Sequence, residues 1–311
     1  IQGLANLGEK KLILFVILLL CYIVILAGNS MIIFLALTDP KLTSPMYFFL
    51  YNLSFVDMVY TTTTIPNMLS GFLTDMKTIS VPGCFLQMYF FIQLAVTSRA
   101  ILTAMAFDRY LAICNPLRYT TIMTRPVRLV LVAGAWGFGI FCTLPATTMS
   151  WLRPYCGPNV VRHGWCDLSS VRQLVCGDTS VDNIVSISFA LVALLTTGVL
   201  ILTSYVLIGV SISRMGVVQR LKAFGTCAAH LTVVSISYNS NNLSLSFRKK
   251  EQGVRIIVSV LYSALTPFLN PMIYSLRNKE LQESIGRTLS RLRPAAVSAT
   301  RNINTVSLER N

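Results

Sequence analysis

From Leu12 to Leu37 the chain reads LILFVILLLCYIVILAGNSMIIFLAL, with no charged side chain. A helix needs about 20 mainly apolar residues to cross roughly 30 Å of hydrocarbon. This stretch is long enough to cross and too long for the core of a cleavable signal peptide. It therefore predicts a membrane-spanning helix near the start of the chain.

Further long stretches with few charges follow. They cover about 45–73, 81–114, 129–152, 183–213, 223–247 and 254–276. The stretch 223–247 is the weakest candidate, because its second half is rich in Ser and Asn. Such side chains are costly against lipid, so they should face the bundle interior or a wet cavity. Together the stretches predict an all-α membrane protein, a seven-transmembrane helix bundle in one domain over 1–293.

The composition favours a membrane protein over a soluble one. Hydrophobic residues make up 54% and charged residues 12% of the chain, about half the usual charged share of roughly 25%. The net charge of +14 would suggest nucleic acid in a soluble protein. Here many Lys and Arg lie between or after apolar stretches, where the positive-inside rule places them. We therefore expect a lipid bilayer as partner and no nucleic acid.

The positions of the basic residues predict the orientation. Basic residues follow the third, fifth and seventh stretches, which puts these segments in the cytoplasm, the N-terminus outside and the C-terminus inside. The rule has exceptions here, because several basic residues fall on the predicted outer side. They are Arg153, Arg162, Arg172 and the cluster Arg248-Lys249-Lys250. The chain begins at Ile1 rather than Met, so we expect that N-terminal residues have been trimmed.

The segment after the last stretch is amphipathic. Leu281, Ile285, Leu289 and Leu292 repeat at helical spacing with charged residues between them. We expect a short helix over 278–292 on the inner membrane surface. The residues 294–311 have little apolar content and are expected to form a disordered cytoplasmic tail.

A charged pair marks the end of the third stretch. Asp108 and Arg109 lie in the run MAFDRY, beside a long apolar helix. Charges there are costly unless they are used. The alternative is that Arg109 only extends its charge to the membrane interface.

The run MAFDRYLAICNPLRY, residues 105–119, closely resembles the odorant-receptor form of the Asp-Arg-Tyr motif of rhodopsin-like G-protein-coupled receptors. Other motifs of that family occur in the same order. They are Gly28-Asn29, PMYFFLYNLSFVD at 45–57, Ser204-Tyr205, KAFGTCAAH at 222–230 and PFLNPMIYSLRN at 267–278. The resemblance extends from about Gly28 to Arg293.

The resemblance implies a receptor and not an enzyme, without cofactor or metal. It implies a small organic odorant and a heterotrimeric G protein of the stimulatory type as partners, a rise in cyclic AMP, and a place in the plasma membrane. Arg109 would be the switch that faces the G protein, held at rest by Asp108. The other residues implied in switching and coupling are Tyr110, Tyr205, Lys222, Pro271 and Tyr274. Pro271 would act as a hinge or as a static kink.

A polar network is expected inside the bundle. Asp57 and Arg99 fall at similar depths, about 18 Å and roughly 15 Å from the inner face. We expect them to pair, or to share a water network with Ser98, Asn270 and Asn29. Arg99 departs from the family pattern, which usually has Glu at the position of Ser98 and no Arg at the next. An arginine there could displace the sodium ion often bound near such an Asp; alternatively, it faces backbone carbonyls elsewhere.

Cys84, Cys156, Cys166 and Cys176 lie at the predicted outer face, where an oxidising compartment favours disulfides. Four cysteines allow three connectivities. The resemblance implies the pairs Cys84–Cys166 and Cys156–Cys176.

The ligand is expected between the helices in the outer half of the bundle, among mostly apolar walls. By position relative to the motifs, the expected contacts are Phe91, Ile92, Ala95, Val96, Phe189, Ala193, Tyr238, Asn241, Asn242, Val260 and Ser263. For each one, plain helix packing is the alternative. The set contains no acid, which argues against an amine as ligand. Arg99 and Arg255 leave an acidic ligand open.

Alternative functions stay open at this point. A transporter would show inverted repeats and broken helices, and neither is visible in the sequence. A membrane enzyme would need a nucleophile with a base or a metal set, which two histidines do not supply. A non-olfactory receptor for a small metabolite would share the fold and differ in where it is expressed.

Overall fold

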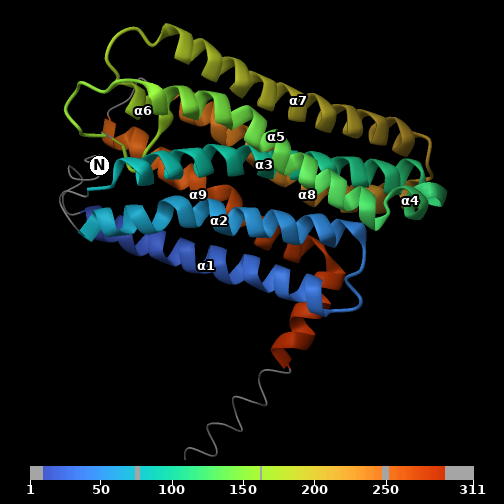
Figure 1. The fold of residues 1–311 in the computed structure, drawn as a ribbon. Coiled ribbons are helices and arrows are strands. Elements are labelled where there is room, and N and C mark those ends of the chain that lie inside the picture. The colour runs from blue at the N-terminus through green and yellow to red at the C-terminus, as the bar shows by residue number, and fades with distance from the viewer. Residues whose placement is uncertain (1–9, 74–77, 162, 247–251, 291–311) are drawn as a thin grey trace, which may run out of the picture.

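A computed structural model describes residues 10–73, 78–161, 163–246 and 252–290. Within them, seven long helices lie side by side along one direction (Figure 1). Their bounds are α1 Lys10–Thr38, α2 Pro45–Leu73, α3 Val81–Cys114, α5 Arg125–Leu152, α7 Ser180–Ser213, α8 Val217–Ser246 and α9 Gln252–Arg277. The shorter helices are α4 Pro116–Ile122, α6 Leu168–Arg172 and a helix over 279–290.

The long helices suit a bilayer. By length and composition alone, α1, α3, α5 and α7 are apolar enough to cross it. The helices α2, α8 and α9 have 29, 30 and 26 residues, which is long enough at about 1.5 Å per residue. Their hydroxyl and amide groups lower their hydropathy. The chain is an all-α membrane protein built as a seven-helix bundle.

Local sequence sets where the helices begin and end. The hydroxyl of Ser80 accepts a hydrogen bond from the backbone N–H of Gly83 at 3.2 Å and caps α3. Asn115 caps the C-terminal end of α3, and the next residue, Pro116, begins the short helix α4. The helix α5 begins at Arg125 rather than at residue 129, because a proline in its first turn favours a helix start. The helix α8 begins at Val217, earlier than the expected residue 223.

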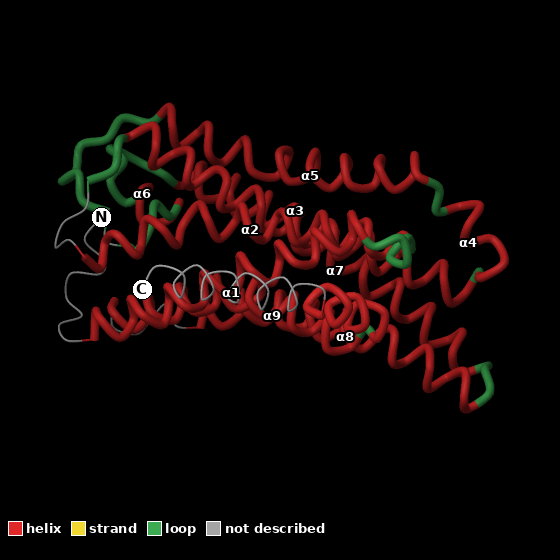
Figure 2. The backbone as a smooth tube through the Cα atoms, turned by 90° about the horizontal axis from the view of Figure 1, so that it is seen from below, coloured by secondary structure: helices red, strands yellow, loops and turns green. Residues whose placement is uncertain are grey.

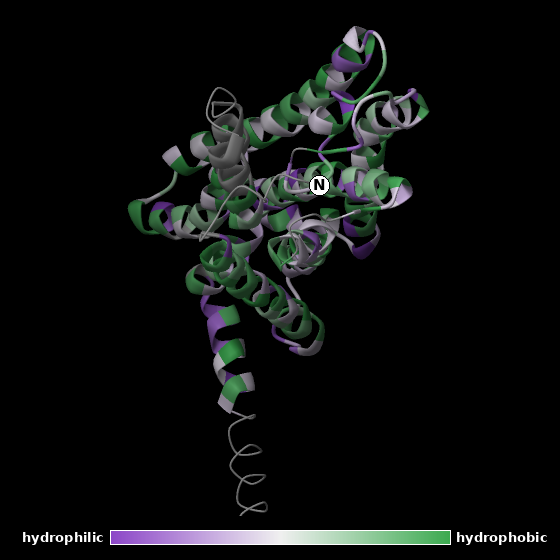
Figure 3. Cartoon of the chain, turned by 90° about the vertical axis from the view of Figure 1, so that its left-hand side faces the viewer, coloured by the Kyte–Doolittle hydropathy of each residue, from purple (hydrophilic) through white to green (hydrophobic). Residues whose placement is uncertain are grey.

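The helix α3 is the centre of the bundle, since it packs against α2, α4, α5, α7 and α8. The helix α1 packs against α2 and α9. Many large apolar side chains on α1, α5 and α7 are exposed. Much of the helical ribbon is coloured as hydrophobic (Figure 3). Leu20, Val130 and Leu202 are more than half exposed, at 57%, 69% and 65%. These surfaces are suited to contact with lipid.

The two ends of the bundle differ. At one end, which we call the disulfide end, the loop between α5 and α7 folds over the helices together with α6 (Figure 2). At the other, the Arg109 end, lie α4, the turn between α1 and α2, and the helix 279–290. The expected segment 278–292 is helical over 279–290, with Leu281 fully buried and Leu289 half exposed. The expected tail, 294–311, and Leu292 lie outside the described residues.

The helix 279–290 is attached to the turn after α1 through Asp39. The Asp39 carboxylate accepts a hydrogen bond from the hydroxyl of Ser284 at 2.6 Å and pairs with Arg287 at 2.7 Å. These contacts hold the helix at the Arg109 end of α1.

Candidate functional site

A buried ion pair lies near the C-terminal end of α3. The Asp108 carboxylate is fully buried and accepts hydrogen bonds from Arg109, 2.7 Å from Nη2 and 3.2 Å from Nε. Its other oxygen accepts the hydroxyl of Tyr119, from α4, at 2.7 Å. We call Asp108, Arg109 and Tyr119 the Arg109 lock. Because a buried ion pair holds only when its partners are hydrogen-bonded, Tyr119 completes it.

A second polar link lies beside the lock and joins three helices. The hydroxyl of Tyr205 on α7 is 2.6 Å from Nδ1 of His230 on α8. Nε2 of the same imidazole is 3.0 Å from the backbone oxygen of Leu102 on α3. A carbonyl only accepts, so the neutral imidazole carries its proton on Nε2 and Tyr205 donates to Nδ1. Tyr110 packs beside Tyr205 in the apolar cluster of Ile208, Ile212 and Cys227.

The expected switch residues of α9 are buried under α1. Tyr274 is 1% exposed, and its hydroxyl has no hydrogen-bond partner among the described residues. Pro271 faces Gly28 so closely that a Cβ on Gly28 would lie 3.0 Å from the proline ring. Glycine therefore lets α1 approach the proline segment of α9. The side chain of Lys222 lies outside the described part of the chain.

The expected polar network is present in part. Nδ2 of Asn270 lies 2.5 Å from Oδ2 of Asp57, and the side chain of Ser98 reaches the same carboxylate. Asn29 donates to the backbone oxygen of Pro267 at 3.2 Å. Asn29, Asp57 and Asn270 are at most 2% exposed.

Arg99 stands apart from this network. Among the described residues, no ion pair joins it to Asp57, so the expected direct pair is absent. Its charge acts instead on the phenols of Tyr60 and Tyr238. Long side chains on a helix lean toward its N-terminal end. In α3 that end is the disulfide end, which carries the guanidinium outward from the level of Asp57.

Both implied disulfides are present at the disulfide end. They join Cys84 to Cys166 and Cys156 to Cys176, each with Cα atoms 5.4 Å apart. Gln87, one turn after Cys84, fixes the same loop: its side chain accepts from the backbone N–H of Cys166 at 3.0 Å. The loop is thus tied to α3 at two adjacent turns.

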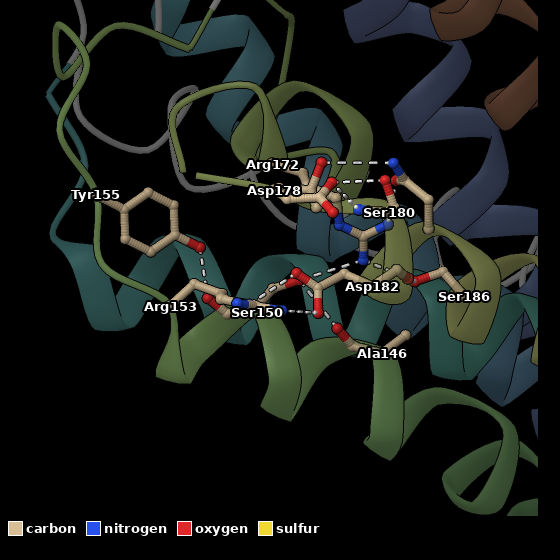
Figure 4. A network of polar contacts seen from close by, with 11 residues as sticks. Ala146, Ser150, Arg153, Tyr155, Arg172, Asp178, Ser180, Asp182 and Ser186 are labelled. Carbon is tan, nitrogen blue, oxygen red and sulfur yellow. Dashed lines mark hydrogen bonds and ion pairs between the residues drawn. The ribbon is translucent and has the colours of Figure 1, made fainter. Parts of the chain in front are cut away.

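Two arginines that break the positive-inside pattern organise this end (Figure 4). Arg153 makes a two-pronged contact with Asp182, at 2.9 and 3.0 Å. Arg172 is 8% exposed and donates to Asn183 at 3.0 Å and Ser186 at 2.6 Å, both on α7. The Asp182 contact raises the pKa of Arg153, and burial lowers that of Arg172. Sequence reasoning missed this role, since partners far apart in the chain leave no local pattern.

The expected ligand residues of α3 divide into two groups. Phe91 stacks on Tyr60 of α2, with ring centres 5.0 Å apart, and lies 5.3 Å from Trp165 of the loop. Phe91 and Ala95 are partly accessible. Ile92, in contrast, packs against the loop cluster around Cys166. Val96 is buried against Cys142 and Ala193, in a contact among α3, α5 and α7.

The expected ligand residues from other helices are more scattered. Phe189 packs against Phe141 of α5, with ring centres 5.5 Å apart. Tyr238 is hydrogen-bonded to Thr197 at 2.7 Å. Ser263 donates to the backbone oxygen of Val260. The side chains of Asn241, Asn242 and Arg255 are outside the described part.

An apolar groove of about 400 Å³ lies elsewhere, between α1 and α9. Of the expected ligand residues, only Val260 lines it. Its walls are aliphatic and aromatic side chains from α1, α2 and α9. The groove therefore does not coincide with the expected ligand site around α3.

Comparison with known proteins identifies the arrangement. A family model described as "Olfactory receptor" matches residues 18–292. The chain belongs to the olfactory receptor family. Among similar proteins, human "Olfactory receptor 6N1" is 42% identical over 295 residues, covering 94% of this chain and 95% of that protein. Mouse "Olfactory receptor 5G25" is 40% identical over 299 residues, covering 93% and 92%.

Membership of the olfactory receptor family fixes the broad class. The family consists of receptors and not of enzymes. Together with the apolar helices, it makes the chain a multi-pass protein of the plasma membrane. Human "Olfactory receptor 10J4" is 39% identical over 285 residues, 91% of this chain and 92% of that protein, so the likeness covers both ends of the bundle.

Proposed function

We propose that the chain binds a small organic odorant between its helices at the disulfide end. Binding then activates a stimulatory G protein at the Arg109 end and raises cyclic AMP. The observation that carries the proposal is the Arg109 lock: a buried ion pair with its third partner on α4, at the end of the central helix. Phe91 lies on the same helix, about 27 Å away along its axis.

The lock explains how binding can be transmitted. While Asp108, hydrogen-bonded in turn by Tyr119, holds Arg109, the guanidinium is not available to a protein partner. A ligand opens the lock only if it binds the open state more strongly than the closed one. Tyr205 and Tyr274 both lie within electrostatic reach of Arg109. The hydroxyl of Tyr274 has no hydrogen-bond partner among the described residues. Both are suited to contact Arg109 once it is released.

The orientation follows from chemistry at the two ends. Disulfides persist in oxidising compartments, which favours the disulfide end as the outer one. Arg118, Arg125 and Arg128 cluster at the Arg109 end, as the positive-inside rule requires of the cytoplasm. The N-terminus is then outside and the C-terminus inside.

A cyclic AMP assay in cells tests the function. The receptor, with an outer epitope tag to measure surface level, is exposed to a chemically diverse panel of volatiles. We expect at least one volatile to raise cyclic AMP in the native receptor and not in Arg109→Ala at equal surface level. Ion flux without a G protein, or a response unchanged in Arg109→Ala, would refute the proposal.

A further inference from the structure

Arg99 is a cation in the middle of the bundle that no described acid neutralises. Its Nε atom is buried and has no hydrogen-bond acceptor among the described residues. The acids on the described long helices are Asp57, Asp108 and Asp182. Asp108 and Asp182 are paired with Arg109 and Arg153, and Asp57 is hydrogen-bonded to Asn270; none of the three forms an ion pair with Arg99. Among the described residues, the guanidinium of Arg99 therefore has no anionic partner.

An unpaired charge at this depth is costly. An arginine at the centre of a membrane helix is unfavourable unless its charge is paired or solvated. The guanidinium cannot escape the cost by losing its proton. Such a residue is expected to pair with an anion, and no acid of the described residues forms an ion pair with it.

The surroundings of Arg99 resemble the walls of a site for an apolar acid. Tyr60 and Tyr238 lie within electrostatic reach of the guanidinium. The hydroxyl of Tyr60 can donate to an anion, whereas that of Tyr238 is bonded to Thr197. Tyr60, Phe91 and Trp165 form a stack that leads from this level to the loop at the disulfide end; we call it the aromatic column. Phe91 lies two turns before Arg99 on α3, so the column offers an apolar surface on the disulfide-end side of the cation.

The side chains of α3 agree with this placement. Phe91, Ala95 and Arg99 are spaced four residues apart and so share one face of the helix. All three are partly accessible, although they lie on the central helix of the bundle. Leu94 and Thr97, between them, are at most 1% exposed. The accessible face of α3 thus carries aromatic, small and cationic groups in order from the disulfide end.

We propose that Arg99 binds the carboxylate of a small organic acid whose apolar part lies along the aromatic column. A planar guanidinium matches a carboxylate with two parallel hydrogen bonds. One cation balances a single negative charge, which favours a monocarboxylate over a phosphate. The proposal names the ligand class of the receptor proposed above and rests on that function.

Binding to the purified, full-length receptor in lipid nanodiscs tests the ligand class without a G protein. The probes are straight-chain and phenyl-substituted carboxylic acids, each beside its methyl ester and its primary alcohol. The readout is the rise of the unfolding temperature with ligand concentration. We expect an acid to bind at least about tenfold more tightly than its own ester. Equal binding of acid and ester, or no binding of any acid, overturns the proposal.

Variants separate the charge from the fold. Arg99→Gln should abolish the preference for the acid, and Arg99→Lys should retain part of it. Arg128→Gln is the matched control, because Arg128 lies over the ring of Phe48 on α2 and is away from the column; it should bind the acid like the native receptor. If Arg99→Gln does not fold, Tyr60→Phe should weaken binding of the acid several-fold more than binding of the ester. A preference for the acid that persists in Arg99→Gln, or an equal loss of acid and ester binding in Tyr60→Phe, contradicts the proposal.

Cyclic AMP measured with the same probes distinguishes the two proposals. Acid binding that depends on Arg99 but raises no cyclic AMP supports the site and counts against the receptor function. A cyclic AMP response to neutral volatiles alone, unchanged in Arg99→Gln, supports the function and overturns the site.

Discussion

The side-chain amide of Asn29 donates to the backbone oxygen of Pro267, 3.2 Å away, and so joins α1 to α9. Pro271 has no N–H, which leaves the carbonyl four residues earlier, that of Pro267, without its helical partner. Asn29 supplies the missing donor, and Gly28 beside it allows the helices to come close enough. Two motifs that lie far apart in the sequence are therefore parts of one contact.

Asn29→Ala should destabilise the receptor by about 1–3 kcal/mol, because it leaves a buried carbonyl unpaired. Asn52→Ala is the matched control: Asn52 donates only to the oxygen of Phe48, on its own helix. We expect a much smaller effect there. The measurement is the unfolding temperature of the purified receptor, and equal losses for the two variants would speak against the contact between helices.

A double-mutant cycle tests the role of Pro271. In Pro271→Ala the restored N–H can bond to the Pro267 oxygen, so Asn29→Ala should cost less in that background. We expect a coupling of about 0.5–3 kcal/mol. Strict additivity of the two changes would show that Asn29 does not serve the acceptor freed by Pro271.

The contact between α3 and α5 depends on Gly139. A Cβ at this position would clash with the hydroxyl of Thr97 and lie 3.0 Å from the backbone oxygen of Gln93. Gly139→Ala should therefore destabilise the bundle by about 1–3 kcal/mol. At Gly137, two residues away, a Cβ meets nothing within 4 Å, and Gly137→Ala should be neutral or slightly stabilising. Surface level and unfolding temperature are the measurements; similar outcomes for both glycines would contradict the close approach.

Tyr119 should set the basal activity of the receptor. Tyr119→Phe removes one hydrogen bond from Asp108 and loosens its hold on Arg109. We expect a rise of cyclic AMP without odorant, compared at equal surface level. Tyr22→Phe is the control, since that hydroxyl bonds to Thr62 away from the lock. A basal level in Tyr119→Phe no higher than in the control would remove Tyr119 from the lock.

The attachment of the helix 279–290 should be insensitive to pH until strongly acidic conditions. The hydroxyl of Ser284, the backbone N–H of Lys41 and Arg287 hold the pKa of Asp39 well below its ordinary value of 3.8. A pKa lower in the folded state adds stability above the unfolded value, and this is lost as the pH falls toward the folded one.

Amide-exchange protection factors of 279–290, which remove the intrinsic pH dependence of exchange, measure this. We expect them to stay level from about pH 8 to about pH 5 and to fall below about pH 4. In Asp39→Asn they should be low throughout and show no such step. A step near neutral pH would assign the attachment to another group.

The sequence predicts the bundle well because each membrane helix carries its own signal. A long stretch without charges locates α1. Pro116 and Pro126 explain where α4 and α5 begin, which apolar content alone does not show. Contacts between distant segments leave no such signal. The partners of Arg172 on α7, and of His230 on α3, follow from how the helices pack rather than from spacing along the chain.

Arg99 shows where depth along a helix fails as a guide. Counting residues puts it level with Asp57, yet the two do not pair among the described residues. The count ignores the lean of a long side chain toward the start of its helix, and it ignores that Asn270 and Ser98 already occupy Asp57. Equal depth is necessary for an ion pair but not sufficient.

The central claim is that occupancy at the disulfide end releases Arg109 at the other end. Nucleotide exchange by a purified stimulatory G protein, with the receptor in nanodiscs, tests it most directly. An odorant found in the cell assay should accelerate exchange in the native receptor and not in Arg109→Ala, while it raises the unfolding temperature of both. Acceleration that is equal in the two proteins, or absent from the native receptor although the odorant binds, would contradict the account.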